Sequence, residues 1–534
     1  MAAPLALPVQ FGFAKLRQTR QHHDAPSRRV MRYLSPSRPR PPSSRSARRL
    51  FFVLWILALG IYAWTLGSRL GAHAAGSDSS GYLNQARLLE RGEVATAPRS
   101  LDGVPPHEAA PFLYVPLGFR PVSFDPPAMA PTYPTGLSLL VLAAAKLAGW
   151  ANAPNWIAAL HGLAGVLVTY ALGRCVGLTP RWSTLAAAMI AVSPLFIFMG
   201  LQAMSDVPAL VWATLAIVCA ETSRRSSIGW AVAAGAAFGL AVLLRPTNAL
   251  MLVPLAIAFQ QAWRRWLAWV LGGLPAALFL AWYQHAAYGA IFTTGYSGIT
   301  SAFKPGLFWP TLVHYAKWLP LLFSPLVVLI VALPWVPTHQ RRTALLLGTW
   351  FVLLAGCYAF YDHTHETWWY LRFLLPAAPA LIVAALLVAQ AWLAGRRWSE
   401  AVRTVAFTVA LLALIIFGAW QTKRLHAHHV GLQERLYPMA CDWARRNFPP
   451  EAMVLAMQVT GALQYHTTFG FVRWDHASAG DAARIRAACE REGRPLYAIL
   501  FAFEETDALN AWSPEAWDKI GQVDQVSFWQ YRAR

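Results

Sequence analysis

Two aspartates stand next to long apolar segments, and a carboxylate in that setting can serve as a general base or anchor a substrate. Asp78 follows the first apolar run and precedes a helix expected from Ser79 to Arg91, and Asp206 opens a later apolar run. Capping of a helix N-terminus is the alternative role for each aspartate. Ionisable groups at the mouth of a membrane helix bundle are costly to keep, so they tend to be functional. We therefore expect Asp78, and secondarily Asp206, to be catalytic.

Four further residues could hold a substrate beside these carboxylates. Tyr82 and Gln85 fall on one face of the helix that follows Asp78 and could line the same site, with ordinary packing as the alternative. Arg245 ends an apolar run, and Arg372 lies where a later run begins. A buried lipid phosphate needs a planar, permanently charged donor such as arginine. For Arg245, extension to the membrane interface is the alternative.

His363, His365 and Glu366 stand close to Arg372 in the sequence and would allow a divalent cation to bind. Their spacing matches none of the usual zinc patterns, so an interfacial polar cluster is the favoured interpretation, with no metal assigned. The sequence also lacks the GxxxxGK[ST], HExxH and GxSxG motifs. Nucleotide-dependent chemistry and zinc or serine hydrolysis are therefore without support.

The elements that must position these residues are membrane helices. The chain of 534 residues is 56% hydrophobic and 13% charged, about half the charge of a typical soluble protein. Its apolar runs are mostly long enough to cross a bilayer as helices. They lie at about 50–67, 136–150, 155–173, 183–201, 207–221, 228–244, 247–263, 266–284, 319–336, 343–361, 373–394 and 402–420.

Loop charges predict the orientation of these helices. The net charge of +20 comes mostly from arginines in the N-terminal arm and the short loops, which is the positive-inside pattern and argues against a nucleic-acid partner. The cytoplasmic turns are marked by Arg174 with Arg181, Arg224–Arg225, Arg264–Arg265, Arg341–Arg342, and Arg396–Arg397 with Arg403. Residues 136–150 are short and carry Lys146, so we expect a re-entrant or surface helix there. Eleven spans then remain, with the N-terminus cytoplasmic and the C-terminus outside.

The predicted fold is thus an all-α polytopic membrane protein with a small C-terminal α/β domain. Residues 1–49 form a disordered basic arm, 50–420 the membrane domain, and 421–534 the extracytoplasmic α/β domain. Outer loops are expected at 68–135 and 285–318, the first lying on the membrane surface because it is rich in proline and aromatic residues. Strands are expected at 454–459, 471–475, 497–501 and 526–531, and helices at 461–467 and 481–491. Cys441 and Cys489 in this domain could pair.

Several short motifs resemble those of the GT-C class of membrane glycosyltransferases, in particular the bacterial family grouped with protein O-mannosyltransferases and the lipid A aminoarabinose transferase. The resemblance covers roughly residues 50–420. It consists of the acidic outer loop at Asp78, YPTG at 133–136, MSDVP at 204–208, RPT at 245–247 and WWYLRFLLP at 368–376. Many relatives carry an adjacent Asp-Glu pair in the first outer loop, whereas Ser79 and Ser80 follow Asp78 here.

The resemblance implies a glycosyltransferase of the inner (cytoplasmic) membrane. Its donor would be a polyprenyl-phosphate-linked sugar, hexosyl or pentosyl, and its acceptor an extracytoplasmic lipid, glycan or protein. Asp78 would be the general base of an inverting transfer, and Asp206 a second acid. Arg245 and Arg372 would bind the lipid phosphate, with Lys304 as a lesser candidate and Tyr296 as a further substrate-binding residue.

Two alternatives remain open at this point. A transporter or lipid-linked glycan flippase would carry no glycosyl transfer, and it predicts charges in the middle of the spans and interrupted helices in matching halves. A non-catalytic assembly or export component would use Asp78 only as a helix cap.

Overall fold

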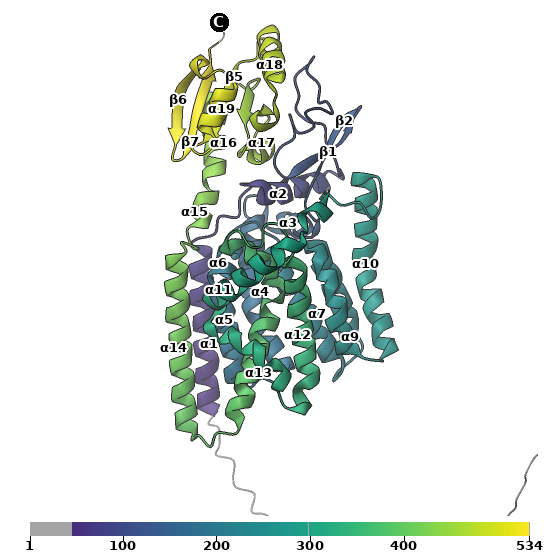
Figure 1. Ribbon diagram of the computed structural model, residues 1–534, viewed down its shortest axis with the longest axis vertical. Helices are drawn as coiled ribbons and strands as arrows, with labels where there is room; N and C mark the ends of the chain where they lie inside the picture. Colours follow the sequence, from purple (N-terminus) through teal and green to yellow (C-terminus); the bar gives the residue numbers. More distant parts are fainter. Residues whose placement is uncertain (1–44, 297, 533–534) are drawn as a thin grey trace, which may run out of the picture. The chain divides into compact units, whose positions relative to one another are not determined.

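A computed structural model of the chain describes residues 45–296 and 298–532 (Figure 1). The predicted disordered arm therefore lies outside the described residues up to position 44, and helix α1 already begins at Arg45. Residues Leu57–Arg534 form one compact unit. The helices up to the last long apolar one are α1 (Arg45–Gly67), α2 (Ser77–Glu90), α3 (Gly136–Ala148), α4 (Ala153–Cys175), α5 (Pro180–Ala191), α6 (Pro194–Gly200), α7 (Asp206–Ser223), α8 (Gly229–Leu244), η1 (Pro246–Met251), α9 (Leu252–Phe259), α10 (Trp263–Tyr288), η2 (Ile299–Ala302), η3 (Pro305–Leu307), α11 (Phe308–Phe323), η4 (Pro325–Trp335), η5 (Thr338–Gln340), α12 (Arg341–Tyr358), η6 (Trp368–Ala377), α13 (Ala378–Ala394) and α14 (Glu400–Arg424).

The protein is a multi-pass membrane protein by the length and composition of its helices. Among the described residues, five helices are long and apolar enough to cross a bilayer: α4, α7, α10, η6 with α13, and α14. Two bent helix pairs raise the number to as many as seven, and shorter apolar helices include α3 and α8. The predicted number of eleven spans therefore stays a prediction.

Two of the predicted spans are not continuous helices. The run at 183–201 is bent by 58° between α5 and α6, and the run at 319–336 is bent by 113° between α11 and η4. In each case the second helix begins with a proline that follows a serine, Pro194 after Ser193 and Pro325 after Ser324. The residue before a proline is driven out of the helical region, so the helix ends there. Each of these two apolar runs is therefore built from two helices.

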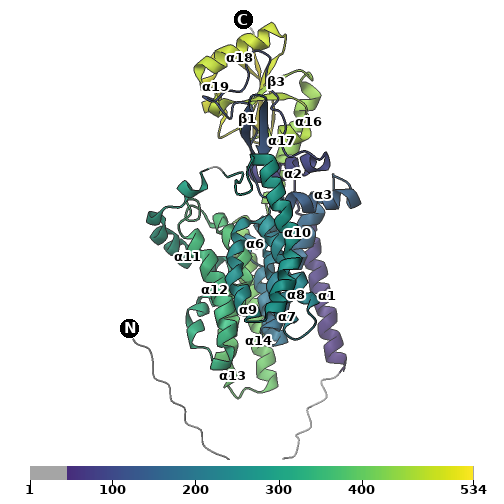
Figure 2. The same cartoon turned by 90° about the vertical axis from the view of Figure 1, so that its right-hand side faces the viewer.

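Close packing of small residues fixes helix α8, which ends at the candidate residue Arg245. A Cβ atom on Gly235 would lie 1.9 Å from the carbonyl oxygen of Trp269, and one on Gly272 would lie 2.0 Å from that of Val232. The backbones of α8 and α10 therefore touch, which is the small-residue packing typical of membrane helices. Figure 2 shows the two helices side by side.

The C-terminal region contains a five-stranded mixed sheet of order β4-β3-β5-β7-β6, with β3, β4 and β5 parallel and β7 and β6 antiparallel. Its elements are α15 (Val430–Glu434), α16 (Leu436–Asn447), β3 (Met453–Ala456), α17 (Thr460–His466), β4 (Gly470–Arg473), α18 (Ala479–Arg491), β5 (Leu496–Phe501), α19 (Glu505–Ala511), β6 (Trp517–Val523) and β7 (Val526–Tyr531). The four strands and two helices expected here are present, and β6 and the helices α15, α16 and α19 were missed.

The possible disulfide does not form. Cys441 belongs to the buried cluster on the α16 side of the sheet, and Cys489 belongs to the cluster on the α18 side. Both cysteines are free. The sheet therefore separates the two thiols.

The outer loop 68–135 is partly built into the C-terminal domain rather than spread on the membrane surface. Leu101, Leu113 and Tyr114 are buried in the same apolar cluster as β3 and α18. The backbone N–H of Arg473 donates to the carbonyl of Leu113. The loop also forms the antiparallel hairpin of β1 (Phe119–Phe124) and β2 (Pro127–Pro131). The aromatic and apolar residues of this loop thus find a protein partner, which corrects the expected headgroup position for this part of it.

Candidate active site

Asp78 lies in the first turn of α2, but it is not the residue that caps this helix. The N-cap is Gly76, and no side-chain capping bond is made there. The same holds for Asp206, which follows the N-cap residue Ser205 in α7. The capping alternative is therefore wrong for both aspartates. Instead, each carboxylate forms an ion pair with one of the two predicted arginines.

The two ion pairs form a single charged cluster, which we call the Asp78 cluster. A guanidinium nitrogen of Arg372 lies 2.7 Å from Asp78 Oδ2, and Arg245 donates to Asp206 Oδ1. The pairs interact with each other, because the charge of Asp206 acts on Arg372 and the charge of Arg245 acts on Asp78. The Phe373 ring lies beneath both guanidinium groups, 5.2 Å from Arg245 and 5.3 Å from Arg372. Residues 78, 206, 245 and 372 thus meet in space.

The Asp78 carboxylate is held in its ionised form. Burial alone would raise the pKa of Asp78, but the charge of Arg372 and hydrogen bonds from Tyr133 and Arg372 outweigh it, so the pKa lies below its usual value. The side chain keeps 24% of its surface exposed, against 1% for Asp206. Asp78 is therefore the more accessible of the two carboxylates.

Three tyrosines surround the charged groups. The Tyr82 hydroxyl hydrogen-bonds to Ser205 at 2.8 Å, and the Tyr133 hydroxyl hydrogen-bonds to Ser77 at 2.8 Å. The Tyr296 ring meets the Tyr133 ring edge-on, with 6.0 Å between the centroids. Burial, followed by the negative charge of Asp78, raises the pKa of Tyr82 and Tyr133, and burial raises that of Tyr296. All three hydroxyls therefore keep their protons, and that of Tyr133 donates to Asp78.

Several polar atoms of the Asp78 cluster lack partners. Asp206 Oδ2, Arg245 Nε and Arg372 Nε are buried and make no hydrogen bond within the described residues. A buried polar atom without a partner costs free energy, and most such atoms in native proteins are satisfied. An anionic group such as phosphate could accept hydrogen bonds from both of these unpaired guanidinium donors.

Two predicted site residues have other contacts. Gln85 is fully buried, donates to the Tyr283 hydroxyl at 2.7 Å and accepts from Ser138, so its amide is occupied by the protein. Lys304 pairs with Asp362 at 2.8 Å and is 57% exposed. The structure brings neither of them to the Asp78 cluster.

The polar residues near Arg372 form contacts among themselves. His363 Nδ1 lies 2.9 Å from Glu366 Oε1. Within the ranges that the structure describes, no group of three or more His, Cys, Asp or Glu side chains is arranged to hold a metal ion.

Sequence reasoning missed Glu434, which lies on α15 next to α2. Its Oε2 accepts a hydrogen bond of 3.3 Å from Ser79, the residue after Asp78. Burial, reinforced by the charge of Asp78, raises the pKa of Glu434 to about 8. The only sequence signal was a lone acid in a segment without apolar periodicity. Tyr133 was also not named as a site residue, although it belongs to the YPTG motif.

The opposite face of α2 borders a cavity of about 310 Å³. It lies between α2 and α17, and its lining includes Arg87, Arg99, Gln464 and Tyr465. Arg87 lies over the Trp150 ring at 3.8 Å and near the Tyr465 ring. Asp78 does not line this cavity, so the helix separates it from the charged cluster.

Comparisons with known proteins agree with the resemblance noted in the sequence. A sequence profile described as dolichyl-phosphate-mannose-protein mannosyltransferase matches residues 137–285. No curated protein sequence matches the chain. The chain is similar in fold to ArnT from Cupriavidus metallidurans bound to undecaprenyl phosphate, with a TM-score of 0.58 and 14% identity over 91% of this chain and 98% of that one.

Two other solved structures share the fold. One is the Archaeoglobus fulgidus oligosaccharyltransferase tethered to an acceptor peptide, with a TM-score of 0.54 and 13% identity over 87% of this chain and 72% of that one. The other is the arabinofuranosyltransferase AftD from Mycobacteria, with a TM-score of 0.50 and 13% identity over 90% of this chain and 40% of that one. The chain therefore resembles the GT-C membrane glycosyltransferases, as its sequence motifs predicted.

Proposed function

We propose that this protein is an inverting glycosyltransferase that moves a sugar from a polyprenyl-phosphate donor to an extracytoplasmic acceptor, with Asp78 as general base. The observation that carries the proposal is the meeting of Asp78, Arg372, Asp206 and Arg245 in one largely buried cluster, whose guanidinium Nε donors have no partner among the described residues. The similar structures that contain undecaprenyl phosphate and dolichol phosphate support the class of donor.

Charge balance explains how the donor would activate the base. Without a ligand, two carboxylates neutralise two arginines in the Asp78 cluster. A donor phosphate adds a further negative charge and competes for Arg372 and Arg245, whose Nε atoms have no partner within residues 45–296 and 298–532. Once Arg372 is shared with phosphate, the pKa of Asp78 rises and its carboxylate becomes a better proton acceptor. Binding of the donor thereby prepares the base.

The chemical step follows from these positions. The acceptor oxygen attacks the anomeric carbon and loses its proton to Asp78. The bond from that carbon to the phosphate oxygen breaks, and its electron pair stays on the phosphate, where arginine guanidinium groups stabilise the growing charge. A single displacement inverts the anomeric carbon. The protonated hydroxyls of Tyr82 and Tyr296 can position the sugar, and Asp206 holds Arg245 in place.

The same proposal includes the predicted topology of eleven spans, with the N-terminus cytoplasmic and the C-terminal domain outside the inner membrane. Its support is that the Asp78 helix contacts the C-terminal domain directly. Asn84 donates to the carbonyl of Gly461 at 2.9 Å, and Ser79 donates to Glu434. The base and the α/β domain would then face the same compartment, where a lipid, glycan or protein acceptor would be met.

The test is transfer of labelled sugar from a polyprenyl-phosphate donor by the purified full-length protein. We expect transfer by the wild type and none above background by Asp78→Asn at equal protein level. Lipid-linked sugars in a deletion strain should show accumulated donor and an under-glycosylated product. Unchanged donor levels in that strain, together with inactive purified protein, would favour a transporter instead.

A further inference from the structure

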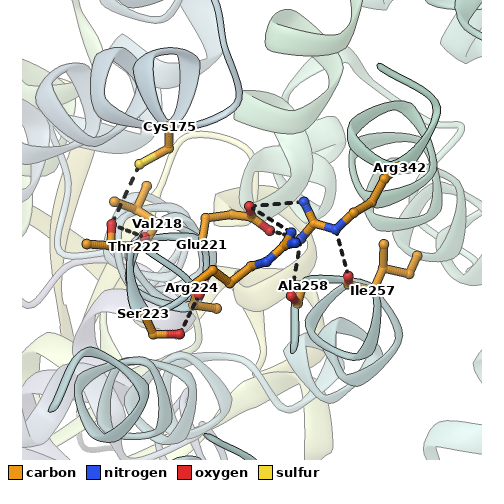
Figure 3. A network of polar contacts seen from close by, with 10 residues as sticks. Cys175, Val218, Glu221, Thr222, Ser223, Arg224, Ile257, Ala258 and Arg342 are labelled. Atoms are coloured by element: carbon orange, nitrogen blue, oxygen red, sulfur yellow. Dashed lines mark hydrogen bonds and ion pairs between the residues drawn. The ribbon is translucent and has the colours of Figure 1, made fainter. Parts of the chain in front are cut away.

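A second charged network lies at the far end of α7 from the Asp78 cluster. Glu221 follows Asp206 by fifteen residues, which places it about 22 Å further along the helix. It forms ion pairs with Arg342 of α12 and Arg224 at the end of α7 (Figure 3). Arg342 also donates to the carbonyls of Ile257 and Ala258 in α9. We call Glu221, Arg224 and Arg342 the Glu221 clamp.

This end of the bundle carries more positive than negative charge. Burial, followed by the charge of Arg342, lowers the pKa of Arg224, and Arg265 and Arg225 act in the same direction. Only Glu221 opposes them. Three further arginines therefore lie within electrostatic range of Arg224, with Glu221 as the opposing carboxylate. Like charges brought together in this way attract anions.

A cavity of about 380 Å³ opens beside the Glu221 clamp. It lies between the loop after α7 and the start of α10, and its polar lining comprises Ser223, Ser226, Arg264 and Arg265, with the indole of Trp263. Trp263 is 66% exposed. Within residues 45–296 and 298–532, neither Arg264 nor Arg265 forms an ion pair with a carboxylate. Neither guanidinium group is therefore neutralised by a carboxylate there, and that of Arg264 lies over the Trp263 ring at 5.5 Å.

We propose that this cavity binds the phosphate headgroup of an anionic phospholipid from the leaflet at that end of the bundle. Guanidinium groups bind phosphate through paired, charge-assisted hydrogen bonds, and the Ser226 hydroxyl can add a further donor. The hydroxyl of Ser223 already donates to the carbonyl of Ala220. An exposed tryptophan beside them is typical of a position at the level of lipid headgroups. Basic pockets between membrane helices recognise acidic headgroups by this chemistry. The cavity lies at the opposite end of α7 from Asp206 and is separate from the proposed donor site.

The test compares lipid retention by the full-length protein and two variants. Each is reconstituted in phosphatidylcholine vesicles with and without phosphatidylglycerol, extracted in a neutral detergent, and examined by native mass spectrometry for bound lipid. Arg264→Ala/Arg265→Ala removes the pocket cations. Arg396→Ala/Arg397→Ala removes the same charge from the exposed loop between α13 and α14 and serves as the matched control. Circular dichroism and thermal unfolding check that each variant folds.

We expect the wild type and the control variant to retain phosphatidylglycerol, and the pocket variant to bind it roughly thirtyfold more weakly. That factor follows from about 1 kcal/mol for each of two basic residues. Equal retention by both variants would overturn the proposal. So would full competition by inorganic phosphate alone, because the ligand would then be a free anion. The readout is lipid binding, so it does not depend on whether the protein transfers sugar.

Discussion

The two ends of α7 carry ion pairs of opposite character. In the Glu221 clamp, Nε and both terminal nitrogens of Arg342 have partners, either Glu221 or carbonyls of α9 (Figure 3). In the Asp78 cluster, Arg245 Nε, Arg372 Nε and Asp206 Oδ2 are buried without partners in the described structure. A fully satisfied network rigidifies a fold, whereas a partly satisfied one has capacity left for a ligand. The comparison separates a structural clamp from a candidate active site on the same helix.

The largest expected effect comes from removing the base. Asp78→Asn keeps the shape of the side chain but cannot accept a proton, so we expect sugar transfer to fall about a thousandfold. Thermal stability should also fall, because Arg372 loses its carboxylate partner, so the rate is compared per folded molecule. The measurement is the initial rate of transfer with purified protein. Asp442→Asn is the control, since Asp442 also pairs with an arginine but is exposed in the C-terminal domain. Full activity of Asp78→Asn would show that this cluster is not catalytic.

Removing Arg372 should weaken donor binding and change the pH dependence of transfer. Loss of charge-assisted bonds to phosphate predicts a donor KM roughly ten- to a hundredfold higher for Arg372→Ala. Because Arg372 holds the pKa of Asp78 low, its removal raises that pKa. The acid limb of the activity profile should therefore move to higher pH. A KM effect with an unshifted profile would contradict the Asp78–Arg372 coupling.

Breaking the Glu221 clamp should cost stability and leave catalysis intact. Glu221→Gln leaves Arg342 without its carboxylate, and Glu221 is only 6% exposed while Arg342 is 27% exposed. With that partial solvation we expect a loss of about 2 kcal/mol in unfolding free energy. Glu400→Gln breaks the exposed pair with Arg181 and should cost well under about 1 kcal/mol. Sugar transfer per folded molecule should be unchanged in both variants. A loss of transfer in Glu221→Gln alone would contradict the distinction between the Glu221 clamp and the Asp78 cluster.

Much of the helical architecture could be predicted from the sequence, because apolar runs and arginine-rich loops are local signals. The bends before Pro194 and Pro325 were not predicted, although a proline within an apolar run is a local signal for a helix break. The burial of Leu101 and Tyr114 against the C-terminal sheet could not be predicted. It depends on a contact between segments more than three hundred residues apart, and the apolar periodicity of either segment does not indicate such a contact.

The site residues also divide into those that a local sequence signal predicted and those that depend on contacts between distant segments. Asp78, Asp206, Arg245 and Arg372 were each predicted from residue type and position at the end of a helix. Their pairing was not predicted, since Asp78 and Arg372 are 294 residues apart. Glu434 was missed altogether, because its burial arises from the contact of α15 with α2 and leaves no local pattern.

The smallest expected effect is a pH dependence of stability that comes from Glu434. This carboxyl lies beside Asp78 and has no ion pair in the part of the chain that the structure describes. Its pKa is raised from 4.5 to about 8, so the folded protein holds a proton that the unfolded chain releases. Stability from this group must therefore fall as pH rises from about 4.5 to about 8. Glu434→Gln removes that dependence, and the Tm of the wild type relative to the variant should decline across this range. The exposed Glu451→Gln should follow the wild type throughout. A wild-type profile parallel to that of Glu434→Gln would mean that Glu434 is ionised and that Asp78 has a second negative charge beside it.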